Sequence, residues 1–190
     1  MKAIRPKSVE DTERRRLHER FHAIYEEALG YVWNTLRRLG VPERHLEDVT
    51  HDVFVVVFRK LGDFDDSLPL RPWLFGIAFN TASDFRRKAV HRREILSTVP
   101  MAPVGEADDQ GSSLDEEVFT REIQTMALKV LHGIEPERAA VLILHDIDGY
   151  SIPEVARSLG IPLNTAYSRL RLARRDFRAA SDLLEKGPQA

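Results

Sequence analysis

The chain of 190 residues has a net charge of −2, and 43% of its residues are hydrophobic, which is enough to build one domain or two small ones. It contains no cysteine, so disulfides and thiolate chemistry are excluded. Residues 1–16 lack an apolar run and no segment is long and apolar enough to cross a bilayer. We therefore expect neither a signal peptide nor membrane insertion, and a cytoplasmic location.

Charge is distributed unevenly along the chain. Residues 86–93 hold five Lys or Arg, residues 169–178 hold five Arg, and residues 97–117 hold six acidic residues and no Lys or Arg. Local basic segments of this kind suit phosphate binding, whatever the net charge. The acidic segment is also rich in Pro, Gly and Ser and has no apolar periodicity, so it is predicted to be a flexible linker between two domains.

The part of the chain before this linker is predicted to be helical. Residues 1–15 are polar and mixed in charge and are expected to form a flexible arm. Apolar residues follow helical spacing from Arg16 to Leu39, with an interruption expected at Gly30. The segment from Glu47 to Leu61 is rich in Val and Phe, as strands are. Its flanks nevertheless align by helical spacing, and no second strand-like segment could pair with it, so we expect a helix.

Residues 62–72 are predicted to form a loop because of their Gly, Pro and Asp content. The carboxylates of Asp63, Asp65 and Asp66 leave open a metal-dependent nucleic-acid enzyme, although the Gly and the distal Glu of a calcium loop are missing. Residues 73–93 predict one long helix that changes from aromatic to polar to basic. Aromatic rings beside cations can stack on exposed bases while the cations hold phosphates. Packing of those rings in a core is the alternative.

After the linker the sequence predicts a four-helix domain that ends in a helix–turn–helix. Ser151 and Glu154 have the spacing of a capping box, Gly160 suits a left-handed C-cap, and Asn164 is expected to cap the final helix. A helix–turn–helix places its second helix in the major groove of DNA. A helical hairpin with a solvated basic face is the alternative. The final helix is expected to bury Ala166, Leu170, Ala173 and Phe177 along one stripe.

Taken in order, these motifs resemble the bacterial sigma factors of RNA polymerase, specifically the two-domain extracytoplasmic-function (ECF) group, over residues 16–180. EDVTHDVFVVVFRKL is similar to the family's core-polymerase-binding helix, RPWLFGIAFNTASDFRRK to the promoter-melting and minus-ten recognition helix, and HDIDGYSIPEVARSLGIPLNTAYSRLRLARRDF to the minus-thirty-five reader. The chain departs from the family at His51, where glutamine is expected. It departs again at Asn164, Ala166 and Tyr167, where Gly, Val and Lys are frequent.

The resemblance implies an all-α fold: region 2 over residues 16–96, the acidic linker over 97–117, region 4 over 118–184, and a tail over 185–190. It implies a sigma factor, not an enzyme, that binds core RNA polymerase and directs promoter recognition, melting and initiation. Its partners would be core polymerase and promoter DNA, as duplex and as the single non-template strand, with an anti-sigma factor as a candidate. We expect a monomer when free, without catalytic residues, metal or other cofactor.

The resemblance also implies three sets of contact residues. Those for core polymerase are Asp48, His51, Asp52, Phe54 and Val55. Those for the minus-ten element are Asp63, Phe64, Trp73, Asn80, Asp84, Arg86 and Arg87, with the loop 63–72 forming a pocket for a flipped base. Those for the minus-thirty-five element are Asn164, Thr165, Tyr167, Ser168, Arg169, Arg171, Arg174 and Arg175. A stand-alone helix–turn–helix regulator that dimerises on palindromic DNA is the alternative function.

Overall fold

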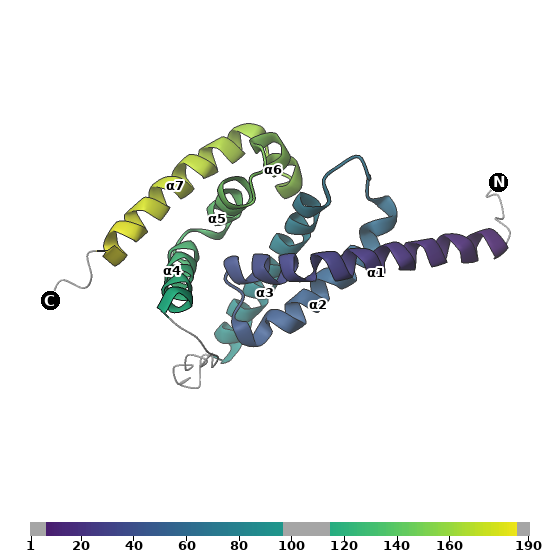
Figure 1. Cartoon of the computed structure of the whole chain (residues 1–190), viewed down its shortest axis with the longest axis horizontal. Coiled ribbons are helices and arrows are strands. Elements are labelled where there is room, and N and C mark those ends of the chain that lie inside the picture. Colours follow the sequence, from purple (N-terminus) through teal and green to yellow (C-terminus); the bar gives the residue numbers. More distant parts are fainter. Residues whose placement is uncertain (1–6, 97–114, 186–190) are drawn as a thin grey trace.

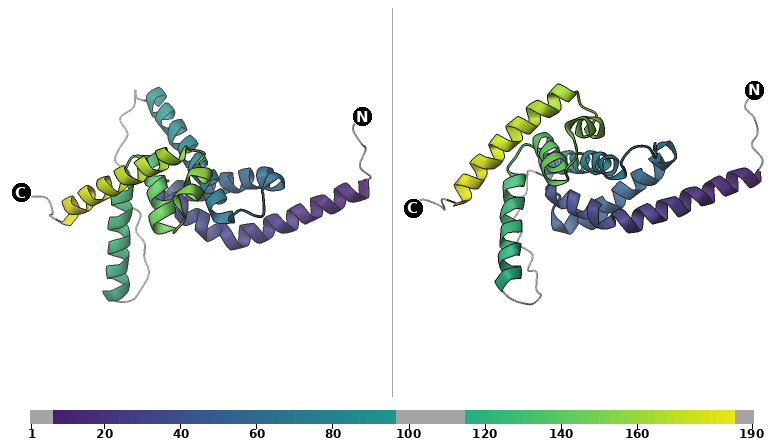
Figure 2. Two further views of the ribbon diagram at one scale, coloured as in Figure 1. Left: turned by 90° about the horizontal axis from the view of Figure 1, so that it is seen from above. Right: turned by 45° about the horizontal axis from the view of Figure 1, so that its top comes forward.

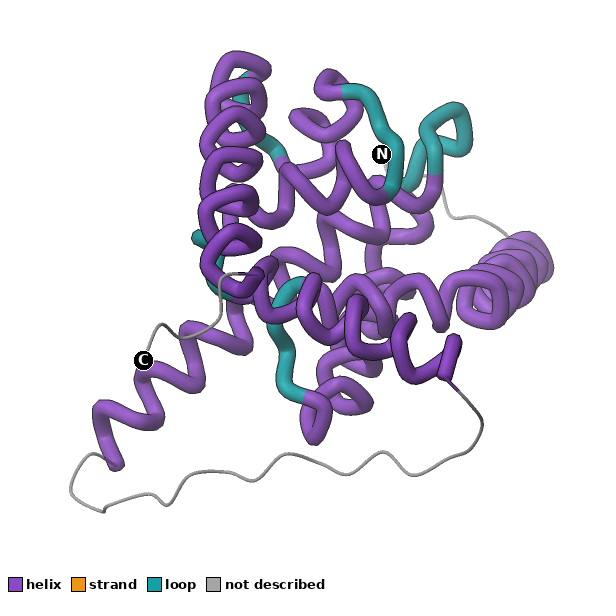
Figure 3. The backbone as a smooth tube through the Cα atoms, turned by 60° about the vertical axis from the view of Figure 1, so that its left-hand side comes forward, coloured by secondary structure: helices purple, strands orange, loops and turns teal. Residues whose placement is uncertain are grey.

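The computed structural model describes residues 7–96 and 115–185, and within these ranges the chain is helical and contains no strand (Figure 1). Loops between the helices are short (Figure 3). The predicted all-α fold of two helical domains is confirmed, while residues 97–114 of the expected linker lie outside the described ranges. None of the described helices could span a membrane.

The first domain comprises α1 (Lys7–Arg38), α2 (Glu43–Lys60), the 3₁₀ turn η1 (Leu61–Asp63) and α3 (Leu70–Leu96). The second comprises α4 (Asp115–His132), α5 (Pro136–Leu142), the π-helical turn η2 (Ile143–Ile147), α6 (Ile152–Leu159) and α7 (Leu163–Glu185).

The Val-rich segment in α2 is helical because its buried side chains recur every three or four residues. Leu46, Val49, Val53 and Val57 are each at most 2% exposed, and α2 packs against both α1 and α3. Burial of this continuous stripe outweighs the weak helix preference of valine, which amounts to less than about 1 kcal/mol per residue. The prediction of a helix in this segment is confirmed.

α1 is longer than the sequence analysis predicted. It begins at Lys7, so residues 7–15 are part of the helix and not a flexible arm, and its N-terminal part extends beyond the rest of the domain (Figure 1). Residues 7–16 contain no Gly or Pro and are rich in Glu and Arg, which favour helices. The helix also continues through Gly30, so the expected interruption is wrong. A single Gly inside a helix costs only about 0.5–1 kcal/mol relative to Ala, which the packing of α1 on α2 and α3 tolerates.

The helix–turn–helix forms largely as predicted. Ser151 and Glu154 make the capping box at the start of α6, and Gly160 ends that helix with φ of +64°. The predicted capping role of Asn164 is wrong, because α7 begins one residue earlier, at Leu163. The carbonyl of Pro162 accepts the first helical hydrogen bond, from the N–H of Ala166 at 3.1 Å. Ala166, Leu170 and Ala173 are buried as expected, while Phe177 is half-buried against the core.

The two domains pack against each other through α3 on α6 and α1 on α4, and their buried residues form one continuous core. In both views of Figure 2, α4 projects away from the bundle and α7 leads outward to the C-terminus, while α6 packs on α3. α3 and α6 approach closely at Gly76, where a Cβ atom would overlap the carbonyl oxygen of Ser158. The hydroxyl of Ser158 in turn donates to the carbonyl of Pro72.

A polar contact joins the domains beside this helix packing. The side chain of Asp148, which follows η2, is only 9% exposed and accepts hydrogen bonds from Tyr31 (2.8 Å) and Arg38 (3.2 Å) of α1. Burial, followed by the charge of Asp148, raises the pKa of Tyr31 well above its ordinary value. Nearby, Nε2 of His132 in α4 donates to the carbonyl oxygen of Arg37 at 2.9 Å. The second domain is therefore hydrogen-bonded to α1 at three residues: Tyr31, Arg37 and Arg38.

Candidate functional site

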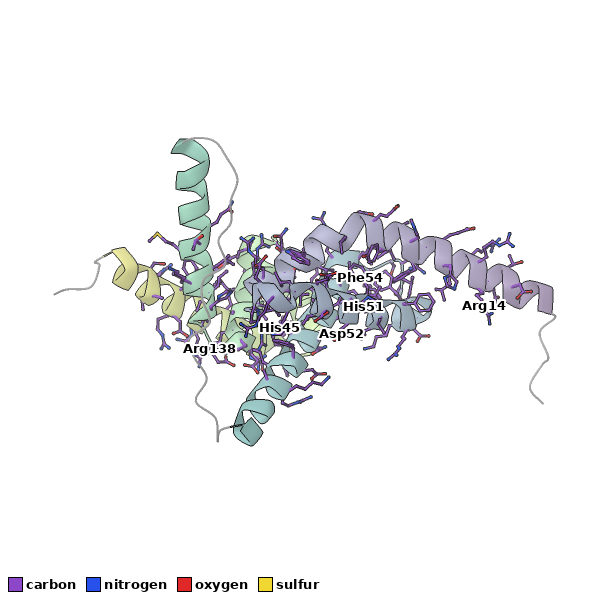
Figure 4. The ribbon with its side chains drawn as sticks, turned by 90° about the horizontal axis from the view of Figure 1, so that it is seen from below. Arg14, His45, His51, Asp52, Phe54 and Arg138 are labelled. Atoms are coloured by element: carbon purple, nitrogen blue, oxygen red, sulfur yellow. The ribbon has the colours of Figure 1, made fainter. Side chains whose placement is uncertain are left out.

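An acidic groove between α1 and α2 collects three of the residues predicted to contact core polymerase. Asp48, His51 and Asp52 line one wall of this groove, which has a volume of about 860 Å³. His51 and Asp52 are exposed on the same side of α2, as Figure 4 shows. Tyr25 and Trp33 of α1 line the opposite wall, and Tyr25 is 40% exposed. An aromatic wall facing carboxylates suits a basic partner segment that also carries apolar side chains.

Two of the predicted contact residues in α2 point elsewhere. Phe54 is only 3% exposed, and the centroid of its ring lies 4.6 Å from that of Tyr25. It therefore supports the aromatic wall from the interior of the domain. Val55 is half-buried and does not line the groove. Tyr25 and Trp33 were missed because their helical spacing in α1 predicts core residues equally well. Gly30 between them exposes the floor of the groove, and a Cβ atom at that position would meet no atom within 4 Å.

The residues predicted to bind the minus-ten element fall into two groups. In the first, Phe64 from the loop and Trp73 from the start of α3 lie with ring centroids 4.5 Å apart, and both are half-buried. Asp63 is exposed in η1 just before them. α3 begins at Leu70, so the loop is shorter than predicted. Pro72 fits within the first turn of the helix, where no N–H donor is needed.

The second group lies along α3. Asn80, Asp84 and Arg87 are exposed at helical spacing on one face, and Arg87 pairs with Asp84 at 2.7 Å. Arg86 points inward instead: its guanidinium donates to the carbonyl of Leu39 at 2.8 Å and to the hydroxyl of Ser83 at 3.0 Å. Burial lowers the pKa of this guanidinium. Arg86 therefore holds the C-terminal end of α1 against α3. Its position among other basic residues in the sequence gave no indication of this structural role.

The carboxylates of the loop do not converge on a metal site. Asp65 accepts a hydrogen bond from the backbone N–H of Ser67 at 2.9 Å, and this bond lowers its pKa. Asp66 pairs with Arg20 of α1. In the part of the chain that the structure describes, no three His, Asp or Glu side chains gather as metal ligands would. The metal-dependent enzyme considered from the sequence gains no support from this loop.

The exposed side of α7 carries the residues predicted to read the minus-thirty-five element. Asn164, Tyr167, Ser168 and Arg171 are exposed, and Tyr167 is 54% exposed despite its size. Thr165 and Arg169 are half-buried. Four arginines follow one another along a hollow of about 680 Å³ beside this helix, together with Tyr167, Leu170 and Leu172: Arg171, Arg174, Arg175 and Arg178.

Two of these arginines are already paired within the domain. Arg174 holds both carboxylate oxygens of Asp146 in η2, at 2.8 and 2.6 Å, and these hydrogen bonds lower the pKa of Asp146. Arg175 pairs with Asp176 at 2.9 Å. Among the described residues Arg171 has no such partner. The π-helical turn thus aims Asp146 at the recognition helix, while Asp148 just beyond it faces the first domain.

The comparisons with known proteins identify both domains. Residues 24–92 match the family described as Sigma-70 region 2, and residues 125–177 match Sigma-70, region 4. The chain is 32% identical over 151 residues to the RNA polymerase sigma factor CnrH of Cupriavidus metallidurans, covering 77% of this chain and 78% of that protein. It is 30% identical over 149 residues to the sigma factor NccH of Alcaligenes xylosoxydans xylosoxydans, covering 73% and 74%.

Solved structures share the architecture. The sigma factor RpoE of Bartonella quintana, in complex with the anti-sigma factor NepR, aligns with a TM-score of 0.68 at 21% identity over 87% of this chain and 98% of that one. CnrH in complex with the cytosolic domain of CnrY aligns with a TM-score of 0.57 at 25% identity, covering 87% and 89%. The chain belongs to the RNA polymerase sigma factors, in their ECF group. It directs promoter recognition and the initiation of transcription, and its partners are core RNA polymerase and promoter DNA.

Proposed function

We propose that this sigma factor binds core polymerase through the acidic groove between α1 and α2 and holds the promoter at two separate places. The observation that carries the proposal is the groove itself, where Asp48, His51 and Asp52 face Tyr25 and Trp33. A carboxylate wall attracts a basic helix, and the aromatic wall supplies apolar and cation–π contacts. A stand-alone regulator would have no use for such a surface on a domain remote from its DNA-reading helix.

We assign the two DNA contacts to α3 with its preceding loop and to α7. Trp73, Asn80 and Arg87 would hold the single non-template strand after melting, through stacking, base-edge and phosphate contacts. Arg171 at the exposed face of α7 would contact duplex DNA in the major groove, where arginine to guanine is the commonest specific contact. The protein would act in the cytoplasm as a dissociable, non-catalytic subunit. Because the two aligned structures hold anti-sigma partners, an anti-sigma factor that covers these surfaces is proposed here too.

Reconstitution with core polymerase tests the proposal. The wild-type chain should support run-off transcription from genomic fragments, and mapped start sites would give its promoter. The double variant Asp48→Arg, Asp52→Arg should lose core binding in a fluorescence titration because it turns an attractive wall repulsive. Glu19→Arg, which reverses an exposed charge on α1 outside the groove, is the matched control and should bind normally. Equal binding by all three proteins would rule out the groove.

A further inference from the structure

Arg20 of α1 is a partly buried cation that reaches the loop before α3. Its side chain is 33% exposed, and its guanidinium lies 5.7 Å from the ring centroid of Phe64. The same guanidinium donates to a carboxylate oxygen of Asp66. On its other side Phe64 meets Trp73 at 4.5 Å. Guanidinium, phenyl ring and indole ring therefore follow one another from α1 to the start of α3.

The other hydrogen bonds of this loop are local. The N–H of Ser67 bonds to Asp65 at 2.9 Å, that of Leu68 to the Asp65 carbonyl at 3.0 Å, and that of Phe64 to the Leu61 carbonyl at 3.3 Å. These bonds shape the turn, and Phe64 also packs against the edge of the hydrophobic core. Arg20 adds two further contacts that restrain the loop, from a helix that is packed on α2 and α3.

We propose that Arg20 is a positioning residue for the capture of the single promoter strand. It rests on the proposed function, in which Trp73 stacks on an unstacked base. By stacking on Phe64 and pairing with Asp66, Arg20 keeps Phe64 in place and so fixes the orientation of the Trp73 ring. A base binds more tightly to a ring that is already held in one orientation, because less freedom is lost on binding.

The role differs from that of a phosphate contact in a way that can be measured. The charge of Arg20 is matched by Asp66, so the pair releases no counterion when DNA binds. A phosphate-binding arginine, in contrast, adds about one to the slope of log K against log salt. Loss of Arg20 should thus weaken strand binding without changing its salt dependence.

The experiment measures the binding of holoenzyme to a fluorescent single-stranded oligonucleotide carrying the non-template minus-ten sequence. Arg20→Ala should weaken binding about two- to fivefold, the size expected for loss of a partly exposed cation–π contact, with an unchanged salt slope and unchanged affinity for core. Arg20→Lys keeps the charge but loses the planar group, so it should fall between wild type and Arg20→Ala. Arg16→Ala, which removes an exposed arginine one turn earlier on α1, is the control and should match wild type.

A spectroscopic measurement on the free chain separates positioning from unfolding. The chain has two tryptophans, so Trp33→Phe leaves Trp73 as the only emitter. In that background Arg20→Ala should increase quenching of Trp73 by acrylamide while the circular dichroism and melting temperature stay close to those of the parent. Arg16→Ala should change neither.

Four outcomes would overturn the proposal. A salt slope reduced by about one would make Arg20 a phosphate ligand, and unchanged strand affinity in Arg20→Ala would leave it without a role. If Arg20→Ala lowered the affinity for core and the melting temperature as well as the affinity for the strand, Arg20 would be a general stabilising residue. If wild-type holoenzyme itself failed to bind the strand while still binding core, the assignment of strand capture to α3 would fail, and the role of Arg20 with it.

Discussion

The phenolic oxygen of Tyr31 lies 2.8 Å from Oδ2 of Asp148, a carboxylate 117 residues away in the sequence and in the other domain. Arg38 approaches the second oxygen of the same carboxylate at 3.2 Å. A single buried acid thus links a π-helical turn in region 4 to the long first helix of region 2. The following predictions test this link and the assignments made along α3 and α7.

Asp148→Asn should lower the free energy of unfolding by about 1–3 kcal/mol, because hydrogen bonds to a charged group would be weakened and Arg38 would lose its counterion. Urea denaturation followed by circular dichroism measures the change. Asp182→Asn, at an exposed position on α7, is the control and should stay within about 0.5 kcal/mol of wild type. Equal stability of the two variants would mean that the domains are not held together by Asp148 in solution.

Tyr31 should make the protein less stable at alkaline pH. Its pKa is raised in the folded state, so above about pH 10, where a tyrosine in the unfolded chain ionises, the unfolded state binds fewer protons than the native one. Stability contributed by Tyr31 is complete below that pH and falls as pH rises, by up to about 1.4 kcal/mol per pH unit. Tyr31→Phe should lack this part of the pH dependence when both proteins are unfolded in urea at pH 9–11.

Gly76→Ala and Gly30→Ala should have opposite effects although both glycines lie inside helices. Alanine is favoured over glycine in a helix by roughly 0.5–1 kcal/mol. At Gly30 the new methyl group meets no atom within 4 Å, so that variant should melt at a higher temperature. At Gly76 the methyl group overlaps the backbone of Ser158 and must push α6 away. We expect a lower melting temperature and a larger radius of gyration by X-ray scattering. An unchanged radius would show that α6 does not rest on Gly76.

Arg86 and Arg87 are neighbours in the sequence, but alanine substitutions at the two positions should have different effects. Arg86→Ala removes two internal hydrogen bonds and should lower the free energy of unfolding by about 1–3 kcal/mol. Arg87→Ala, at an exposed position, should leave stability unchanged and weaken holoenzyme binding to promoter DNA, with a decrease in the salt slope of less than one because Arg87 is paired with Asp84. The reverse pattern would show that Arg86 is the residue that faces DNA.

Arg171 should contribute more than Arg174 to the salt dependence of promoter binding. Arg171→Ala removes an exposed charge and should reduce the salt slope by about one, whereas Arg174 is already neutralised by Asp146. Asp146→Asn should therefore free Arg174, tighten binding to DNA of any sequence and steepen the salt slope. Titration at several salt concentrations with matched promoter and random duplexes measures both. A smaller slope for Asp146→Asn would contradict the assignment.

The sequence predicted the helices well where one physical signal dominated. The Val-rich segment of α2 was predicted correctly because its flanking polar residues share its helical period and the sequence offers no second strand-like segment to pair with it. The capping box of Ser151 and Glu154 and the left-handed Gly160 are local signals, and both are present. The limits of α1 and α7 were missed because helix ends are set by single residues, as at Pro162, whose carbonyl begins α7 in place of Asn164.

Tertiary contacts explain the rest of the differences. Tyr25 and Trp33 follow the same spacing as core residues, so only the packing of α2 shows that they border an open groove. Arg86 cannot be told from Arg87 by composition, since its inward direction depends on the distant carbonyl of Leu39. The π-helical turn η2 adds a residue to one turn and so changes where Asp146 and Asp148 point. Helical periodicity alone does not predict such an insertion.

The packing of α6 on the start of α3 has a consequence for affinity. Trp73 shares a cavity of only about 100 Å³ with Arg157 and Ser158, too small for a nucleotide. A strand that reaches this side of the indole must first displace α6. The apparent affinity of the free chain is then its intrinsic affinity multiplied by the fraction of molecules with the domains apart. In the free chain, the domain interface formed by Asp148, Ser158 and Gly76 therefore competes thermodynamically with strand binding at this side of Trp73.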